Sequence, residues 1–180
     1  SILIALSIGT KLITLLIIPL LYKKLGVRKS VIYYSLIFVF FSLMWIPYFE
    51  NDFYVNYFQT INLWFNSFEF NASIYYIIRW LGFKIVGWNM IAIIGKILPL
   101  FIILFILFFS LYKKNKSTQQ LITSLLYGIS IYFLLSTTVH PWYIASPLLL
   151  SVFTRYKFSI IWSLAVMLSY LAYSTEGVSE

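Results

Sequence analysis

Long apolar runs separated by short polar connectors dominate this sequence. A bilayer core about 30 Å thick needs about 20 helical residues to cross it. Apolar runs, the last two of them short, occupy Ile2–Tyr22, Val31–Phe49, Met90–Tyr112, Leu121–Val139, Trp142–Thr154 and Phe158–Tyr173. The pattern predicts an all-α fold, a polytopic membrane helical bundle with about six transmembrane helices. We expect residues 1–180 to form a single transmembrane domain and to be a fragment of a longer multi-span protein.

The long segment between the second and third runs has a different pattern. Over Phe53–Phe68 and again over Ile74–Val86, apolar residues recur at helical spacing opposite polar ones. Such amphipathic stretches with tryptophans nearby are typical of helices that lie in the headgroup plane. The sequence therefore predicts one or two interfacial amphipathic helices in addition to the crossings.

Composition excludes several classes of protein. Apolar residues make up 62% of the chain and charged residues 10%, whereas soluble domains are about half apolar and about a quarter charged. Cysteine is absent and there is one histidine, so we expect no disulfide scaffold, no metal site and no bound cofactor. The net charge of +8 comes from residues placed between apolar runs, which indicates membrane topology and no nucleic-acid partner.

The basic residues also predict an orientation. Nine of the thirteen lie in three alternate connectors: Lys23, Lys24, Arg28, Lys29; Lys113, Lys114, Lys116; Arg155, Lys157. By the positive-inside rule these connectors face the cytoplasm. Segment 50–89, the turn at 140–141 and the tail from Ser174 then lie outside. We expect a multi-pass integral protein of a bacterial inner membrane whose active site faces outward.

The most informative turn is Val139-His140-Pro141-Trp142-Tyr143. Proline cannot continue a helix, so His140 lies at a break between the fourth and fifth runs. The fifth run spans only about 20 Å, against a core of about 30 Å, which would place His140 in a recess of the outer leaflet. A polar group at that depth is a candidate for function, and Trp142 and Tyr143 could stack on a sugar. The alternative is a proline-broken hairpin whose histidine bonds to neighbouring backbone.

Two lysines lie within the apolar runs. Lys96, six residues into the third run, has an expected depth of about 9 Å from the outer face. Lys96 and His140 could therefore act together on a lipid-linked phosphate at one level, although Lys96 could instead extend to the outer headgroups. Lys11 lies midway along the first run, where such extension is harder, and the sequence assigns it no role.

A polar cluster around Glu69 and Asn71 lies between the two predicted interfacial helices. Carboxylates and amides can bind sugar hydroxyls, and a carboxylate can serve as a base. Glu69 is thus the one catalytic candidate in this segment, and both residues are candidates for substrate binding; a solvated turn would look similar. Glu50 and Asp52 are expected to end the second run in water.

Two stretches resemble a known family. They are Ser136-Thr137-Thr138-Val139-His140-Pro141-Trp142-Tyr143 and 65–76, Phe65-Asn66-Ser67-Phe68-Glu69-Phe70-Asn71-Ala72-Ser73-Ile74-Tyr75-Tyr76. Within residues 60–175 the chain resembles the C-terminal part of bacterial GT-C membrane glycosyltransferases, particularly the polyprenol-phosphate-mannose-dependent mannosyltransferases. The resemblance implies transfer of a sugar, often mannose, from a polyprenyl-phosphate donor to a glycan or lipid acceptor of the cell envelope, with inversion. It also implies a catalytic carboxylate in an outer loop that lies outside this segment.

The leading hypothesis is therefore the substrate-binding half of a lipid-linked sugar transferase, with His140, Lys96, Trp142, Tyr143, Glu69 and Asn71 as the binding residues. Its partners would be membrane lipid, the polyprenyl-phosphate sugar and the acceptor. The alternative is a transporter or flippase of lipid-linked sugars, which would use the same cationic recess without breaking a bond. A non-catalytic membrane scaffold is the third hypothesis.

Overall fold

The computed structural model describes residues 1–50 and 52–170, with the side chains at 64–66 excepted. Over these residues the chain is helical, with one isolated bridge between extended segments. The order is α1 (Ile2–Thr10), α2 (Ile13–Ile17), η1 (Ile18–Leu21), α3 (Tyr22–Leu25), α4 (Val27–Trp45), η2 (Ile46–Tyr48), α5 (Phe53–Ser67), α6 (Ile74–Val86), α7 (Ile91–Tyr112), α8 (Thr118–Leu135), η3 (Pro141–Ile144), α9 (Ala145–Val152), α10 (Phe158–Met167) and η4 (Leu168–Tyr170).

Three of the helical segments are long and apolar enough to cross a membrane: Val27–Tyr48, Ile91–Tyr112 and Thr118–Leu135. This confirms the all-α fold and is compatible with a membrane protein. Two further apolar helices, Pro141–Val152 and Phe158–Tyr170, are shorter, so about six crossings stays a prediction. The end of the predicted sixth run and the tail from Ser174 lie outside the described residues.

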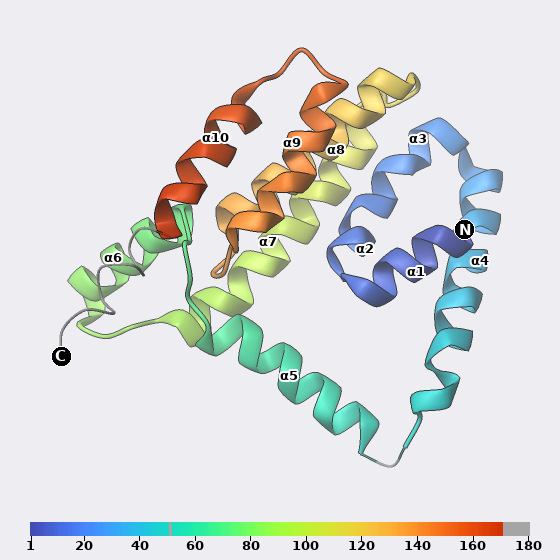
Figure 1. The fold of residues 1–180 in the computed structure, drawn as a ribbon. Coiled ribbons are helices and arrows are strands. Elements are labelled where there is room, and N and C mark those ends of the chain that lie inside the picture. Colours follow the sequence, from blue (N-terminus) through green and yellow to red (C-terminus); the bar gives the residue numbers. More distant parts are fainter. Residues whose placement is uncertain (51, 171–180) are drawn as a thin grey trace.

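The first apolar run is not the single helix that the sequence predicted over Ile2–Tyr22. Helix α1 ends at Thr10, and Lys11 is extended, with φ −149° and ψ 115°. Figure 1 shows α1 and α2 as two arms of a bend at this point. Side-chain hydroxyls form hydrogen bonds around the break. The Thr10 hydroxyl donates to the Ser7 carbonyl, and the Ser7 and Thr14 hydroxyls lie 2.8 Å apart in a hydrogen bond. Hydroxyl side chains compete in this way with helical hydrogen bonds, so an apolar run can break where they cluster.

The fourth run was also placed wrongly at its end. Helix α8 runs from Thr118 to Leu135, not to Val139. It begins at a capping box between Ser117 and Gln120, which satisfies two otherwise unpaired backbone N–H groups. The Ser136 hydroxyl donates to the Tyr132 carbonyl at 2.7 Å, and Ser136 itself is extended. The residues that follow are therefore free to pair with another segment.

Both amphipathic segments are helices, as predicted, at α5 and α6. Helix α6 ends at Gly87, whose φ of +84° is left-handed, a conformation that glycine adopts without steric cost. Whether these two helices lie in the headgroup plane stays a prediction.

The main core lies along one face of α7. Its buried residues Ile94, Leu98, Ile102 and Ile106 recur at every fourth position and pack in one cluster with Leu20 of η1. The opposite face of α7 exposes large apolar side chains: Ile93, Ile97, Leu100, Phe101, Leu104, Phe108. A helix that is apolar on both faces, with one face uncovered, is typical of contact with lipid.

The three basic connectors lie at one end of the molecule. In Figure 1 the α3–α4, α7–α8 and α9–α10 connections are at the top, while α5, α6 and the chain between α8 and η3 are toward the other end. A hydrogen bond of 2.9 Å from the Lys24 ammonium to the Thr118 hydroxyl joins the first connector to the start of α8. This grouping agrees with the charge pattern from which the orientation was predicted.

Candidate functional site

Two polar segments that are far apart in the sequence lie side by side in the structure. Phe70 and Thr138 form a parallel bridge: the Phe70 N–H donates to the Thr137 carbonyl at 3.0 Å, and the Val139 N–H donates to the Phe70 carbonyl at 2.8 Å. The Thr138 hydroxyl donates to the Phe68 carbonyl at 3.0 Å. The two stretches singled out in the sequence therefore form one structural unit, between the α5–α6 junction and the break before η3.

An aromatic cluster surrounds His140. The His140 ring stacks on Trp142, with centroids 4.4 Å apart and planes 5° from parallel. Phe70 and Tyr143 also contact it, at 5.2 and 5.3 Å. His140 is half-buried while Trp142 is 56% exposed, so the indole presents surface beside the histidine. The predicted break at His140-Pro141 is present, because His140 is extended and Pro141 begins η3.

Lys11 reaches this cluster from the break between α1 and α2. Its ammonium lies 5.0 Å from the centroid of the Tyr143 ring, within the range of a cation–π interaction. His140 contacts the same ring, with the two planes nearly perpendicular, so an ammonium and an imidazole both contact one tyrosine. We refer to Phe70, His140, Trp142, Tyr143 and Lys11 as the His140 cluster.

Lys96 does not belong to the His140 cluster. It is exposed on α7, and across the part of the chain that the structure describes no hydrogen bond, ion pair or ring contact joins it to these residues. The sequence paired His140 with Lys96, whereas the lysine that contacts the His140 cluster in the structure is Lys11. A role of Lys96 in substrate binding stays a prediction. The sequence feature that distinguished Lys11 was its position midway along an apolar run.

Glu69 is the centre of a separate network. Its carboxylate accepts hydrogen bonds from the Tyr75 hydroxyl at 2.6 Å and the Asn89 amide at 2.7 Å, and forms an ion pair with Arg79 at 3.1 Å. Tyr75 is fully buried. Burial, together with the hydrogen bond to Glu69, raises the pKa of the Tyr75 hydroxyl well above its usual range. These contacts tie α6 and the start of α7 to the α5–α6 junction, and they occupy the carboxylate that the sequence offered as a base.

Asn71 also has a structural contact. Its amide donates to the Val139 carbonyl at 3.3 Å, next to the parallel bridge. Its φ of +49° is left-handed, and asparagine tolerates that conformation better than most residues. The Asn71 side chain thus helps to hold the segment that precedes His140.

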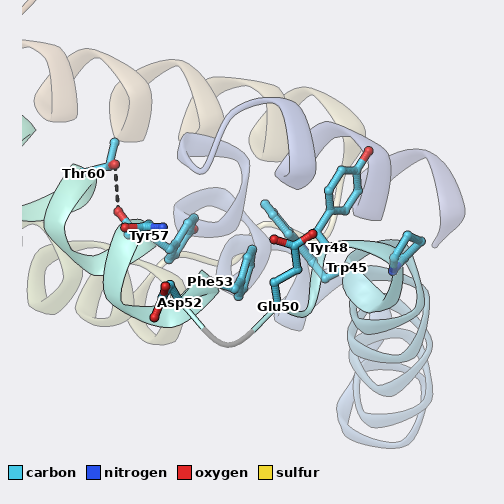
Figure 2. Close-up of a pocket in the computed structure, with 9 residues that line it drawn as sticks. Trp45, Tyr48, Glu50, Asp52, Phe53, Tyr57 and Thr60 are labelled. Atoms are coloured by element: carbon cyan, nitrogen blue, oxygen red, sulfur yellow. Dashed lines mark hydrogen bonds between the residues drawn. The ribbon is translucent and has the colours of Figure 1, made fainter.

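An open groove of about 880 Å³ lies at the turn between α4 and α5. It combines aromatic rings with two carboxylates: Trp45, Tyr48, Phe53, Tyr57, Glu50, Asp52. Figure 2 shows Phe53 and Tyr57 face to face beside these acids, and the two rings stack at 5.9 Å. The indole N–H of Trp45 is buried without a hydrogen-bond partner among the described residues. We call this the α4–α5 groove.

From the sequence, Glu50 and Asp52 were expected only to end the second run in water, so this groove was not predicted. Aromatic residues beside an acidic pair at the end of an apolar run were the available signal. Among residues 1–50 and 52–170, no group of three or more histidines and acids is arranged to hold a metal ion.

No protein-family model, curated protein or solved structure matches this chain.

Proposed function

We propose that this chain is the substrate-binding part of a membrane glycosyltransferase that uses a polyprenyl-phosphate sugar donor, with mannose the expected sugar. The observation on which the proposal chiefly depends is that Lys11 and His140 both contact the Tyr143 ring. Two nitrogen donors beside an exposed tryptophan match a phosphate joined to a sugar, because cations and N–H groups bind phosphate oxygens and an indole face can stack on a sugar ring.

The proposed reaction places a charge where these donors lie. An acceptor hydroxyl oxygen attacks the anomeric carbon, the bond from that carbon to the phosphate oxygen breaks, and the phosphate leaves with the bonding electrons. Lys11 and His140 would stabilise the negative charge that develops on the phosphate. The acceptor proton passes to a carboxylate that the family resemblance places outside this segment.

The α4–α5 groove would bind sugars of the acceptor. Carboxylates accept hydrogen bonds from sugar hydroxyls, and the stacked rings of Phe53 and Tyr57 offer apolar faces. Helix α5, whose 15 residues measure about 22 Å, lies between this groove and the His140 cluster. An acceptor that engages both is therefore several sugars long.

The test compares three variants of the full-length protein in membranes, two in the His140 cluster and one control. Lys11→Gln and His140→Asn are expected to weaken use of labelled polyprenyl-phosphate mannose by about tenfold or more, since a hydrogen bond to a charged group contributes about 1.5–3 kcal/mol. Lys96→Gln removes the same charge from an apolar helix away from the cluster and is expected to change it by less than about twofold. Transfer that is unaffected by Lys11→Gln and His140→Asn would overturn the assignment. Loss in Lys96→Gln and His140→Asn, but not in Lys11→Gln, would favour the pairing predicted from the sequence.

The alternative, a flippase of lipid-linked sugars, is favoured by one observation. Helix breaks inside membranes often mark transport sites, and Lys11 lies at a helix break between α1 and α2. Reconstituted vesicles distinguish the two functions. Movement of the lipid-linked sugar across the bilayer with the phosphate–sugar bond intact would support transport, whereas release of polyprenyl phosphate together with a longer acceptor would support transfer.

A further inference from the structure

A second pocket, of about 590 Å³, lies at the opposite end of the molecule from the proposed donor site, among the basic connectors. The connections after α7 and after α9 both contribute to it. Three cationic residues line it, Lys113, Lys114 and Arg155, and no aspartate or glutamate is among its described lining residues. The remaining lining is largely hydroxyl and amide side chains, including those of Ser117, Gln120 and Thr123. We call this the connector pocket.

The floor of the connector pocket is fixed by buried contacts. Asn115 is only 1% exposed, and its φ of +33° is left-handed. Its amide donates to the Leu20 carbonyl at 3.5 Å, and its side-chain oxygen accepts from the Ser124 hydroxyl at 2.5 Å. These contacts join the α7–α8 connection to η1 and to α8. The lysines that precede Asn115 therefore start from a fixed stretch of backbone.

The cations in the pocket have no acidic partner among the described residues. Arg155 donates to the Tyr156 hydroxyl at 3.1 Å, and its guanidinium lies 5.2 Å from the centre of that ring. The pKa of the Tyr156 hydroxyl is lowered, first by the hydrogen bond from Arg155 and then by the Tyr127 hydroxyl and nearby Lys113. This indicates a positive potential at the Tyr156 hydroxyl. By contrast, the Lys157 ammonium is occupied by the carbonyls of Ser151 and Thr154, at 3.1 and 3.0 Å.

We infer that the connector pocket binds the phosphate group of an anionic molecule at this end of the long helices. A pocket of three cations with hydroxyl and amide donors suits a phosphate, which offers several strong acceptor oxygens. Basic pockets beside membrane-spanning helices bind anionic lipid headgroups. The same chemistry would also accept a soluble phosphate. This inference does not depend on the proposed transferase activity, since no residue of the His140 cluster takes part.

The experiment uses the full-length protein in nanodiscs of phosphatidylcholine mixed with phosphatidylglycerol. The lipid retained by the protein is measured by mass spectrometry after mild detergent extraction, and protection by inorganic phosphate is measured as a shift of the thermal midpoint. The pocket variant combines Lys113→Gln, Lys114→Gln and Arg155→Gln. The control combines Lys23→Gln, Arg28→Gln and Lys29→Gln, which removes the same charge at the same end from residues that do not line the pocket.

We expect phosphatidylglycerol retention to fall by about tenfold or more in the pocket variant and by less than about twofold in the control, because only the pocket variant loses charge-assisted hydrogen bonds to a bound phosphate. If retention is unchanged but phosphate protection is lost only in the pocket variant, the site is confirmed with a soluble phosphate as its ligand. Equal effects in both variants, or none in either, would overturn the inference. A charge-retaining variant, Lys113→Arg, Lys114→Arg and Arg155→Lys, keeps the test valid if the neutral variant folds poorly, and it should retain the lipid.

Discussion

Removing the Glu69 carboxylate should destabilise the α5–α6 junction strongly. In Glu69→Ala the buried Tyr75 hydroxyl loses its acceptor, at a cost of about 1–3 kcal/mol, and a further hydrogen bond to the charged group, from Asn89, is lost. The ion pair adds at most about 1 kcal/mol, because Arg79 is 35% exposed. The two lost hydrogen bonds and the ion pair together lead us to expect a loss of about 3–5 kcal/mol in the free energy of unfolding. Glu69→Gln, which keeps one acceptor, should lose about 1–2 kcal/mol.

The assay is reversible unfolding of the purified protein in detergent micelles, followed by circular dichroism. Glu50→Ala is the matched control, since it removes an acid from the open α4–α5 groove and should change stability by less than about 0.5 kcal/mol. If Glu69→Ala is no less stable than Glu50→Ala, the network does not stabilise the fold as argued. A Glu69→Gln protein with wild-type stability and no sugar transfer would instead show that Glu69 is the catalytic base predicted as a candidate from the sequence.

Three further predictions follow from the described contacts. The raised pKa of Tyr75 means that the folded state holds the hydroxyl proton more tightly than the unfolded state does. The free energy of unfolding should therefore be fully retained below the usual tyrosine pKa of about 10 and should fall as pH rises above it. Tyr75→Phe should flatten this fall when unfolding is measured as a function of pH. Ser117→Ala removes the capping box of α8 and should cost about 1 kcal/mol, measured by the same unfolding assay, whereas Ser117→Asp should restore most of it. Ile102→Ala leaves a cavity in the buried face of α7 and should lower the free energy of unfolding by about 2–4 kcal/mol. Ile103→Ala, on the exposed face, should lower it by less than about 1 kcal/mol. Similar losses for the two variants would refute the assigned buried face.

The sequence predicted helices well wherever periodicity determined the structure. The amphipathic segment at Ile74–Val86 is α6 with the same bounds, and the run at Met90–Tyr112 is α7 within one residue. Both helices have the regular spacing of apolar residues and clear flanking signals that such an inference requires.

Predictions failed where hydrogen bonds decide the backbone within an apolar run. Hydropathy reports average composition, so it gave no sign that Lys11 is extended or that α8 ends at Leu135. The pairing of Phe70 with Thr138 was likewise out of reach, because a single sequence holds no record of which distant segments meet. The grouping of Trp142 and Tyr143 with His140 was therefore predicted, but not the approach of Lys11, which the fold brings from the α1–α2 break.

The bridge between the α5–α6 junction and the residues before His140 has a consequence for biosynthesis. Asn71 and its partner Val139 are 68 residues apart, and a chain grows from its N-terminus at about 5–20 residues per second. The junction is therefore made several seconds before its hydrogen-bonding partner, while α7 and α8 are synthesised. During that interval the polar backbone of 68–71 lacks these hydrogen-bonding partners, so the joint forms only after the chain has been made as far as Val139.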